Sequence, residues 1–261
     1  MTGHHLKQPF SIFPLGDAAI TIDLGNAIEE SLSKRALAIQ NWLVSSHFSG
    51  ILDIIAAYSS VAVFYDPVAV RKEAPCLDGA FACMRQRLEM AWEQTGGEAV
   101  AGPEAAGVSD QVIRKMKTGD NGNVIRIPVC YEGVYAPDLE RLSREKGLTP
   151  EEVIHLHVSR VYRVYMIGFL PGFPYLGRLD ERLQTPRKQR PVPVKAGGVG
   201  IAGNQTGIYS LNSPGGWQII GRTPEKLFNP ASDNPVRLKI GDSIVFFPIT
   251  GEQFRDLELR E

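Results

Sequence analysis

Residues 196–221 read AGGVGIAGNQTGIYSLNSPGGWQIIG, a run of 26 residues with eight glycines and no charged or histidine side chain. An ordinary surface loop carries charges, whereas glycine lets the backbone take a positive φ or approach a ligand closely. The run therefore predicts a tightly folded, neutral surface that presents amides and hydroxyls. Such a surface suits a small-molecule pocket or a protein interface.

The segments on either side of this run are short, β-rich and punctuated by Gly and Pro. The predicted elements are a strand at 124–130, helices at 138–146 and from 149, and strands at 162–167, 236–240 and 243–248. Gly147 is predicted to end the first of these helices, and Thr149 with Glu152 to cap the second. Short strands with few helices predict a closed or nearly closed β-barrel.

The first part of the chain has a different pattern, in which strand and helix signals alternate. The predicted elements are strands at 10–13, 19–23, 51–56 and 60–65, and helices capped by Asn26 and Asp78. This pattern predicts a small α+β sandwich. We therefore expect an α+β chain with an N-terminal α+β domain at 1–100, a linker at 101–122 and a barrel domain at 123–261.

Composition narrows the class of protein. The chain has 261 residues, 43% hydrophobic content and a formal net charge of −1, so no broad basic field attracts nucleic acid or anionic lipid. We find neither an apolar leader nor a membrane-length apolar segment. The three cysteines contain no C-x-x-C pair and predict free thiols. We expect a cytoplasmic protein that binds neither nucleic acid nor membrane.

Two segments match phosphate-binding motifs and two histidines are close in sequence, but the surrounding residues argue against a phosphate site and a metal site. Residues 198–203 match G-x-G-x-x-G, but the residues that follow cannot sustain the helix that a dinucleotide site needs. Residues 216–223 resemble a P-loop, yet their centre, Trp-Gln-Ile-Ile, is typical of a strand. His155 and His157 are two apart on a predicted helix and face different directions, so we predict no metal site.

Three stretches carry a resemblance to a known family: GFLPGFPYLG at 168–177, VGIAGNQTGIY at 199–209 and SPGGWQIIGRTP at 213–224. They resemble allophanate hydrolase subunit 1, also known as the KipI family. The resemblance implies a cyclophilin-like barrel behind a smaller α+β domain. It also implies two partner proteins, one like allophanate hydrolase subunit 2 and one like LamB/YcsF, and ATP-dependent opening of 5-oxoproline to L-glutamate.

Candidate site residues follow from that chemistry. His157 is the titratable candidate for acid–base catalysis, with a structural histidine as the alternative, and Gln205 is the second catalytic candidate. Arg222, or alternatively Lys195, would supply a positive charge to an anionic substrate. The predicted substrate-binding residues are Phe169, Phe173, Tyr175, Asn204, Thr206, Tyr209 and Arg222, and the predicted partner interface contains Ser213, Pro214 and Trp217. The aromatic residues among them fit barrel packing equally well.

Two other functions stay open. A KipI-type inhibitor of a sensor histidine kinase is a binding module and needs no substrate. A carboxyltransferase half of a biotin-dependent urea carboxylase is less favoured, because the chain contains no Met-Lys-Met biotin-carrier motif and no fused biotin carboxylase.

Overall fold

The structure is a computed structural model that describes residues 9–25, 27–73, 78–96 and 124–260. It divides into two compact units, Met1–Pro103 and Glu104–Glu261. The predicted linker at 101–122 and the predicted cap at Asn26 lie outside the described residues. Among the described helices, none has the length and apolar character needed to cross a membrane.

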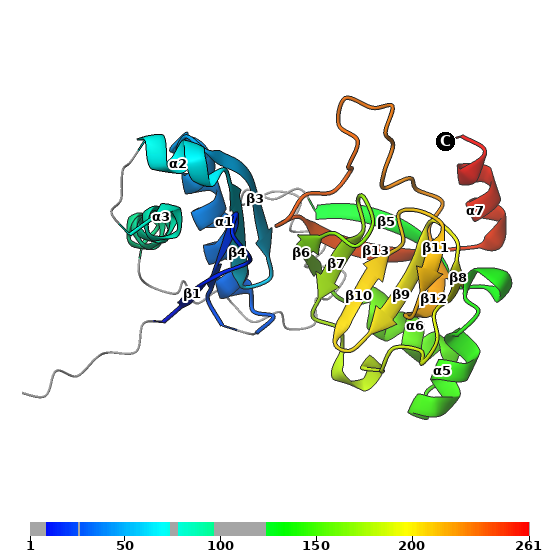
Figure 1. Cartoon of the computed structure of the whole chain (residues 1–261). Coiled ribbons are helices and arrows are strands. Elements are labelled where there is room, and N and C mark those ends of the chain that lie inside the picture. The colour runs from blue at the N-terminus through cyan, green and yellow to red at the C-terminus, as the bar shows by residue number, and fades with distance from the viewer. Residues whose placement is uncertain (1–8, 26, 74–77, 97–123, 261) are drawn as a thin grey trace, which may run out of the picture. The chain divides into compact units, whose positions relative to one another are not determined.

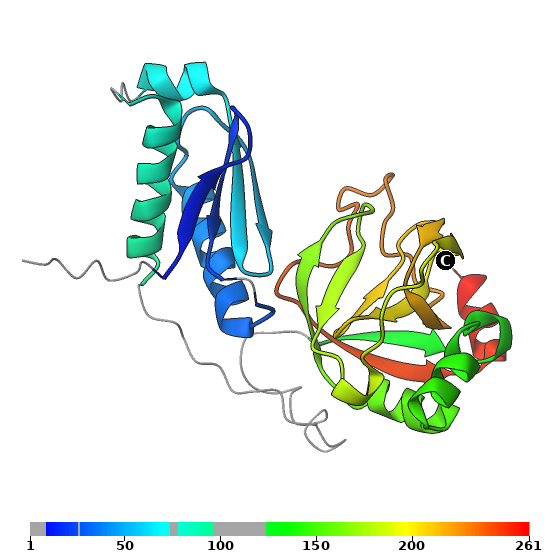
Figure 2. The same cartoon turned by 60° about the horizontal axis from the view of Figure 1, so that its bottom comes forward.

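The first unit is a four-stranded antiparallel sheet with helices packed against it (Figures 1 and 2). The strand order is β1-β2-β4-β3. The elements are β1 (Ser11–Pro14), β2 (Ala19–Asp23), α1 (Glu30–Ser45), β3 (Ile51–Ala57), β4 (Ser60–Tyr65), α2 (Pro67–Glu73) and α3 (Ala80–Gln94). The predicted strands and the two longer helices are present, and α2 was not predicted.

Periodicity explains how this unit buries its core. Strand β4 turns Val61, Val63 and Tyr65 inward, as the period of two requires. Helix α1 buries Ala36, Ile39 and Leu43 at the predicted helical spacing. Two details were predicted wrongly: α3 is capped by Gly79 rather than Asp78, and Cys83 is disulfide-bonded rather than a free thiol.

The second unit is a closed barrel with the strand order β10-β7-β6-β13-β5-β12-β9 (Figure 1). Its strands are β5 (Val124–Cys130), β6 (Tyr162–Ile167), β7 (Pro174–Gly177), β9 (Gly198–Ala202), β10 (Gln205–Ile208), β12 (Gln218–Arg222) and β13 (Ser243–Ile249). A separate two-stranded sheet pairs β8 (Val192–Val194) with β11 (Ser213–Gly215). The helices are η1 (Gly133–Tyr135), α5 (Leu139–Lys146), α6 (Pro150–Val158), η2 (Glu181–Leu183) and α7 (Gly251–Glu258). The predicted fold class, a small α+β domain followed by a β-barrel domain, is confirmed.

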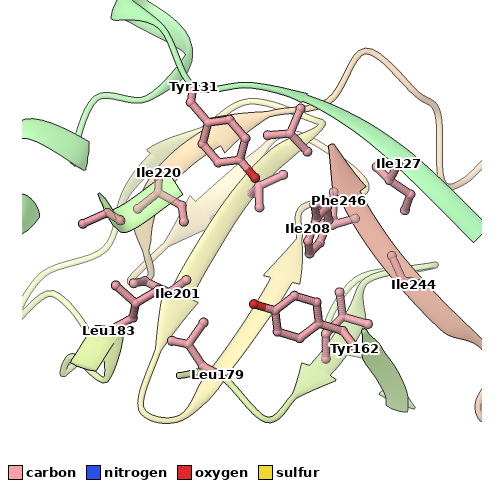
Figure 3. Packing of buried hydrophobic residues seen from close by; sticks show 14 of the residues in the cluster. Ile127, Tyr131, Tyr162, Leu179, Leu183, Ile201, Ile208, Ile220, Ile244 and Phe246 are labelled. Carbon is pink, nitrogen blue, oxygen red and sulfur yellow. The ribbon is translucent and has the colours of Figure 1, made fainter. Parts of the chain in front are cut away.

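The barrel is filled by branched aliphatic and aromatic side chains from all around its wall. In Figure 3, Ile127, Ile201 and Phe246 project into the interior from three different strands. Strand β13 inserts between β5 and β6: it pairs with β5 in parallel from Ser243↔Val124 to Ile249↔Cys130, and with β6 in the antiparallel sense. This insertion joins segments far apart in the sequence and closes the wall.

Local signals set most of the boundaries in this unit. Helix α5 ends at Gly147, which has φ +65°, and α6 begins with the predicted capping box of Thr149 and Glu152. The predicted strand at 236–240 is wrong. Only Val236 pairs there, in an isolated bridge to Phe228. Helix α7 was not predicted, although Thr250 and Gln253 form a capping box before it.

Candidate functional site

The uncharged run at 196–221 contains strands β9 and β10 and most of β12, and so forms part of the barrel wall. Strands β9 and β10 are antiparallel and joined by the two-residue turn Gly203–Asn204, with Gln205 opposite Ala202. The G-x-G-x-x-G match therefore ends in a hairpin, and the P-loop-like residues 216–223 contain strand β12. Neither segment leads into a helix, so neither makes the phosphate cradle that its letters suggest.

An aromatic cluster lies beside this wall and uses many of the predicted substrate-binding residues. Phe173, Tyr209 and Trp217 are buried, and Phe173 meets the other two edge to face at centroid distances of 5.1 and 5.5 Å. Half-buried Tyr175 lies 4.8 Å from Phe173. Since these rings fill one another's space, Phe173, Tyr209 and Trp217 are packing residues in this structure, and Trp217 presents little surface to a partner.

Glycines make room for the cluster. A Cβ at Gly215 would lie 2.3 Å from the Tyr209 hydroxyl, and one at Gly207 would lie 2.9 Å from Phe173. Phe169 differs from the other rings because it is 63% exposed and has φ +69°, a conformation that is strained for a bulky residue. Phe169 is therefore the aromatic residue of this group that is most open to a ligand or partner.

His157 lies inside the barrel and is fully buried. Thr206 Oγ1 donates to Gly200 O (3.0 Å) and therefore accepts from His157 Nε2 (2.9 Å). The hydroxyl of Tyr131 donates to His157 Nδ1 (2.8 Å). This pattern assigns the neutral, Nε2-protonated imidazole. Figure 3 shows the hydroxyls of Tyr131 and Tyr162 pointing into the interior of the barrel.

The environment of His157 opposes a role in proton transfer. Burial lowers its pKa from 6.5 to about 3, because the charged imidazolium would lose its hydration. Its ring stacks on Phe246 at 4.6 Å, and its own carbonyl accepts from the hydroxyl of Tyr162 (2.8 Å). Thr206 is likewise fully buried. This geometry favours the structural alternative for His157 and leaves Thr206 inaccessible to a small molecule.

The remaining predicted residues lie at several places on the barrel. Gln205 and Asn204 are half-buried at the β9–β10 turn, where Asn204 O accepts from Leu179 N (2.8 Å). Ser213 and Pro214 lie in the small β8–β11 sheet, with Pro214 exposed. Lys195 is exposed. No shared centre unites these residues in the part of the chain that the structure describes.

Arg222 is held by its own chain. Its Nε donates to Ala196 O (2.8 Å), its Nη2 lies 3.3 Å from Glu258 Oε1, and its guanidinium covers the ring of Phe254 at 5.2 Å. These contacts connect β12 to helix α7. A substrate carboxylate would have to compete with them for the same guanidinium.

A polar cleft of about 820 Å³ opens beside the aromatic cluster. It is bounded by α5 and the two residues before it, by residues 185–193 and by the first residues of β12. Its charged lining residues are Asp138, Arg141, Glu145, Lys146, Arg187 and Lys188, four basic side chains against two acidic ones. This excess of positive charge suits a small anionic ligand.

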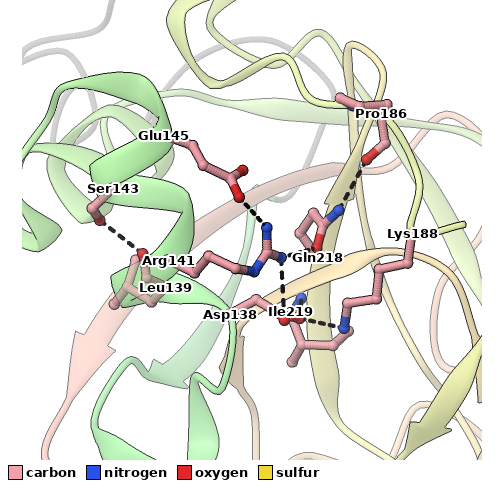
Figure 4. A network of polar contacts seen from close by, with 9 residues as sticks. All are labelled: Asp138, Leu139, Arg141, Ser143, Glu145, Pro186, Lys188, Gln218 and Ile219. Carbon is pink, nitrogen blue, oxygen red and sulfur yellow. Dashed lines mark hydrogen bonds and ion pairs between the residues drawn. The ribbon is translucent and has the colours of Figure 1, made fainter.

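Asp138 is the centre of a hydrogen-bonded network at the base of the cleft (Figure 4). Its Oδ2 accepts from Ile219 N (2.6 Å) and from Lys188 Nζ (2.5 Å). Arg141 Nη2 donates to Gln218 Oε1 (2.6 Å), and Arg141 Nη1 donates to Glu145 Oε1 (2.6 Å). Because the network joins α5, β12 and residues 185–193, it fixes the shape of the cleft.

Sequence reasoning missed this cleft. Asp138 was assigned only to the beginning of a helix, and its side chain makes no helix-capping bond. The available signal was the basic segment at 187–190, where three of four residues are Lys or Arg, five residues before the long uncharged run. Among the described residues, no group of three or more His, Cys, Asp or Glu side chains is placed to hold a metal ion.

Comparisons with known proteins identify the family. Residues 10–238 match the family model described as carboxyltransferase domain, subdomain C and D. The chain is 37% identical to the B subunit of 5-oxoprolinase from Bacillus subtilis (strain 168), over 80% of each chain. It is 36% identical to the B subunit of 5-oxoprolinase from Escherichia coli O157:H7, over 90% of this chain and 94% of that protein.

A solved structure agrees with the fold. The crystal structure of TTHA0988 superposes with a TM-score of 0.68 at 29% identity and covers 92% of this chain. The chain spans only 41% of TTHA0988, so the comparison concerns one part of that larger protein. The chain therefore belongs to the carboxyltransferase-domain (subdomain C and D) family that includes proteins named as the B subunit of 5-oxoprolinase, which confirms the resemblance to allophanate hydrolase subunit 1 and the KipI family.

Proposed function

We propose that this chain is the B subunit of an ATP-dependent 5-oxoprolinase. On this proposal it opens 5-oxoproline to L-glutamate together with two partner proteins, one like allophanate hydrolase subunit 2 and one like LamB/YcsF. The observation that carries the proposal is the identity of 36–37% to two proteins named as the B subunit of 5-oxoprolinase, each matched over four fifths or more of its length. We also propose that the assembled enzyme is cytoplasmic.

The proposed chemistry explains the need for ATP. A lactam is a stable amide, and transfer of the γ-phosphoryl group to its oxygen makes the ring carbon a better electrophile. Attack by one water then breaks the C–N bond and leaves an acyl phosphate, and a second water hydrolyses this acyl phosphate, so that the products are L-glutamate, ADP and inorganic phosphate. A site for this sequence must bind a small anion and shield the activated ring from other water molecules. The polar cleft supports the first of these requirements, because its lining is predominantly basic.

The two glycine-rich segments that match phosphate-loop motifs by letter are a poor fit to the phosphates of ATP. Within the described ranges, the two glycine-rich segments that resemble phosphate loops form strands and a hairpin. We therefore propose that the partner proteins supply most of the ATP site. This chain would then contribute surfaces that complete the substrate site.

The test is 5-oxoproline-dependent ATP hydrolysis by the purified chain, alone and mixed with the two partner proteins. Activity that needs all three proteins supports the proposal. An inactive mixture that nevertheless forms the complex contradicts it and favours another substrate or the kinase-inhibitor function. Carboxyl transfer is the second candidate, because the matched family model describes carboxyltransferase subdomains. Turnover that requires a biotinylated carrier would favour it.

The same assay tests Gln205. We expect Gln205→Ala to abolish activity of the assembled enzyme while the fold and the complex persist, if its amide contacts the lactam. Gln94→Ala is the control, because Gln94 is an exposed glutamine at the end of α3 in the other unit. Normal turnover by the Gln205 variant removes this residue from the site.

A further inference from the structure

We propose that Arg187 binds the carboxylate of a small ring-containing acid at the edge of the polar cleft, with Tyr175 as the apolar wall beside it. The identification of that acid as 5-oxoproline rests on the proposed function. The subsite itself rests on the contacts of residues 184–188, on the charges in the cleft and on the position of the aromatic cluster.

The segment that carries Arg187 is tied to the barrel on both sides of this residue. Thr185 exchanges two backbone hydrogen bonds with Gly203, at 3.3 and 2.6 Å. The other ties are Lys146 Nζ to Gln184 O, Gln218 Nε2 to Pro186 O (3.0 Å), Lys188 N to Gly216 O (2.7 Å) and Lys188 Nζ to Asp138 Oδ2 (2.5 Å). A backbone held in this way presents its side chains from a fixed position, which lowers the entropic cost of binding.

The other basic side chains of the cleft already have partners. Lys188 pairs with Asp138, and Arg141 with Glu145. Lys146 donates to a backbone carbonyl. Arg187 is exposed and makes neither a hydrogen bond nor an ion pair with any described residue. It is therefore the cation in the cleft lining that is available to a ligand.

Arg187 lies on the side of the cleft that adjoins the aromatic cluster. A Cβ at Gly216, next to Trp217, would lie 3.8 Å from the Cβ of Arg187. Burial raises the pKa of Tyr175 and of Tyr209, and the positive charge of Arg187 opposes both increases, as it does only at short range. The half-buried ring of Tyr175 lies 5.8 Å from that of Trp217, so we place it on the same side of the aromatic cluster as Arg187.

A guanidinium that is unpaired among the described residues and lies beside an aromatic ring favours a carboxylate ligand over a polyphosphate. The guanidinium is a planar fork that matches the two oxygens of a carboxylate. A nucleotide triphosphate needs several cations, whereas Lys188 and Arg141 here are paired with Asp138 and Glu145, and Lys146 already donates to a backbone carbonyl. An apolar ring attached to the carboxylate would contact Tyr175.

Binding to the full chain is the first test. We would titrate wild type, Arg187→Gln and Arg187→Lys with 5-oxoproline and with 2-pyrrolidinone, the same lactam without the carboxylate. We expect Arg187→Gln to weaken 5-oxoproline binding by about 10- to 100-fold, as the loss of a charge-assisted pair predicts. Arg187→Lys should restore part of it, and binding of 2-pyrrolidinone should not change. Arg190→Gln is the matched control, because Arg190 is exposed in the same segment.

Kinetics of the assembled enzyme give the second readout. Arg187→Gln should raise the KM for 5-oxoproline and leave the KM for ATP unchanged. An unchanged KM for 5-oxoproline overturns the subsite while the proposed function stands. A rise in the KM for ATP, or loss of inorganic phosphate binding in the same variant, overturns the assignment to a carboxylate.

A third measurement separates the subsite from the proposed function. If the complex does not act on 5-oxoproline, the proposed function fails, and cyclopentanecarboxylate becomes the probe. Binding of cyclopentanecarboxylate that is lost in Arg187→Gln and kept in Arg190→Gln supports the subsite even then. Equal binding by all three proteins, or binding by none of them, overturns it.

Discussion

The apolar interior of the barrel and the polar cleft each hold a titratable side chain, and the two surroundings are built in opposite ways. Inside the barrel, His157 has a hydrogen-bond partner on each ring nitrogen and no contact with solvent. At the cleft, Asp138 accepts hydrogen bonds from Lys188 and from the backbone of Ile219, and the exposed side chain of Arg187 is available to a ligand. The comparison teaches that a titratable residue can have all its hydrogen bonds satisfied inside a core, while a cation that is unpaired among the described residues lies at a cleft that no sequence motif marks.

The largest expected effect is the dependence of stability on pH that His157 causes inside the barrel. A base whose pKa is about 3 when folded and 6.5 when unfolded binds its proton preferentially in the unfolded state. Stability is therefore complete above pH 6.5 and falls as the pH decreases towards 3, at about 1.4 kcal/mol per pH unit. The free energy of unfolding should be lower by about 3 kcal/mol at pH 4 than at pH 7, as measured by urea denaturation.

Variants assign this pH effect to His157. His157→Asn should flatten the slope between pH 6.5 and pH 5, and His155→Asn, an exposed neighbour on the same helix, should keep it. If His157→Asn does not fold, the imidazole resonances of the wild-type protein decide. A His157 signal that titrates near pH 6.5 would contradict the full burial of this residue, and His157 would again be a candidate for acid–base catalysis.

The second effect is the loss of stability when the hydrogen-bonded network of the polar cleft is broken. Asp138→Ala removes the acceptor of the buried Ile219 N–H and of Lys188, so unfolding free energy should fall by about 2 kcal/mol. Glu145→Ala removes an exposed ion pair with Arg141 and should change stability by less than about 0.5 kcal/mol. Chemical denaturation of both variants measures the difference. Equal losses would mean that Asp138 does not organise the cleft.

The smallest effect concerns the border between the aromatic cluster and the cleft. Gly215→Ala places a methyl group 2.3 Å from the Tyr209 hydroxyl and should cost about 1 to 2 kcal/mol. Gly216→Ala meets its nearest atoms at 3.7 and 3.8 Å, so it should be nearly neutral. Thermal unfolding of the two variants is the measurement. Similar melting temperatures would show that the cluster adjusts easily, and Tyr209 would then be a mobile residue rather than a fixed wall.

Elements governed by local signals could be predicted from the sequence. Strands β5 and β6, the Gly147 terminus and the Thr149 capping box all depend on residues within a few positions of one another. The segment at 236–240 failed because its alternating pattern was not decisive. Leu238 is buried without strand pairing, so packing alone explains its apolar character.

The cleft could not be predicted, because it depends on tertiary contacts. Asp138 lies 50 residues from Lys188 and 81 from Ile219, and each residue has an ordinary explanation when taken alone. His157 shows the converse problem. Its position was predicted correctly on helix α6, but only the contacts of Tyr131 and Thr206 show that both its nitrogens are engaged. Hydrogen-bond partners of this kind have no signature in spacing.

The position of β13 has a consequence for biosynthesis. This strand is made last among the barrel strands, yet it lies between the first two, β5 and β6. A nascent chain that has reached β12 therefore exposes two strand edges, which cannot be covered until residues 243–249 leave the ribosome. Exposed edges are where incomplete chains associate with one another. The wall of the barrel therefore stays open until the last of its strands has been synthesised.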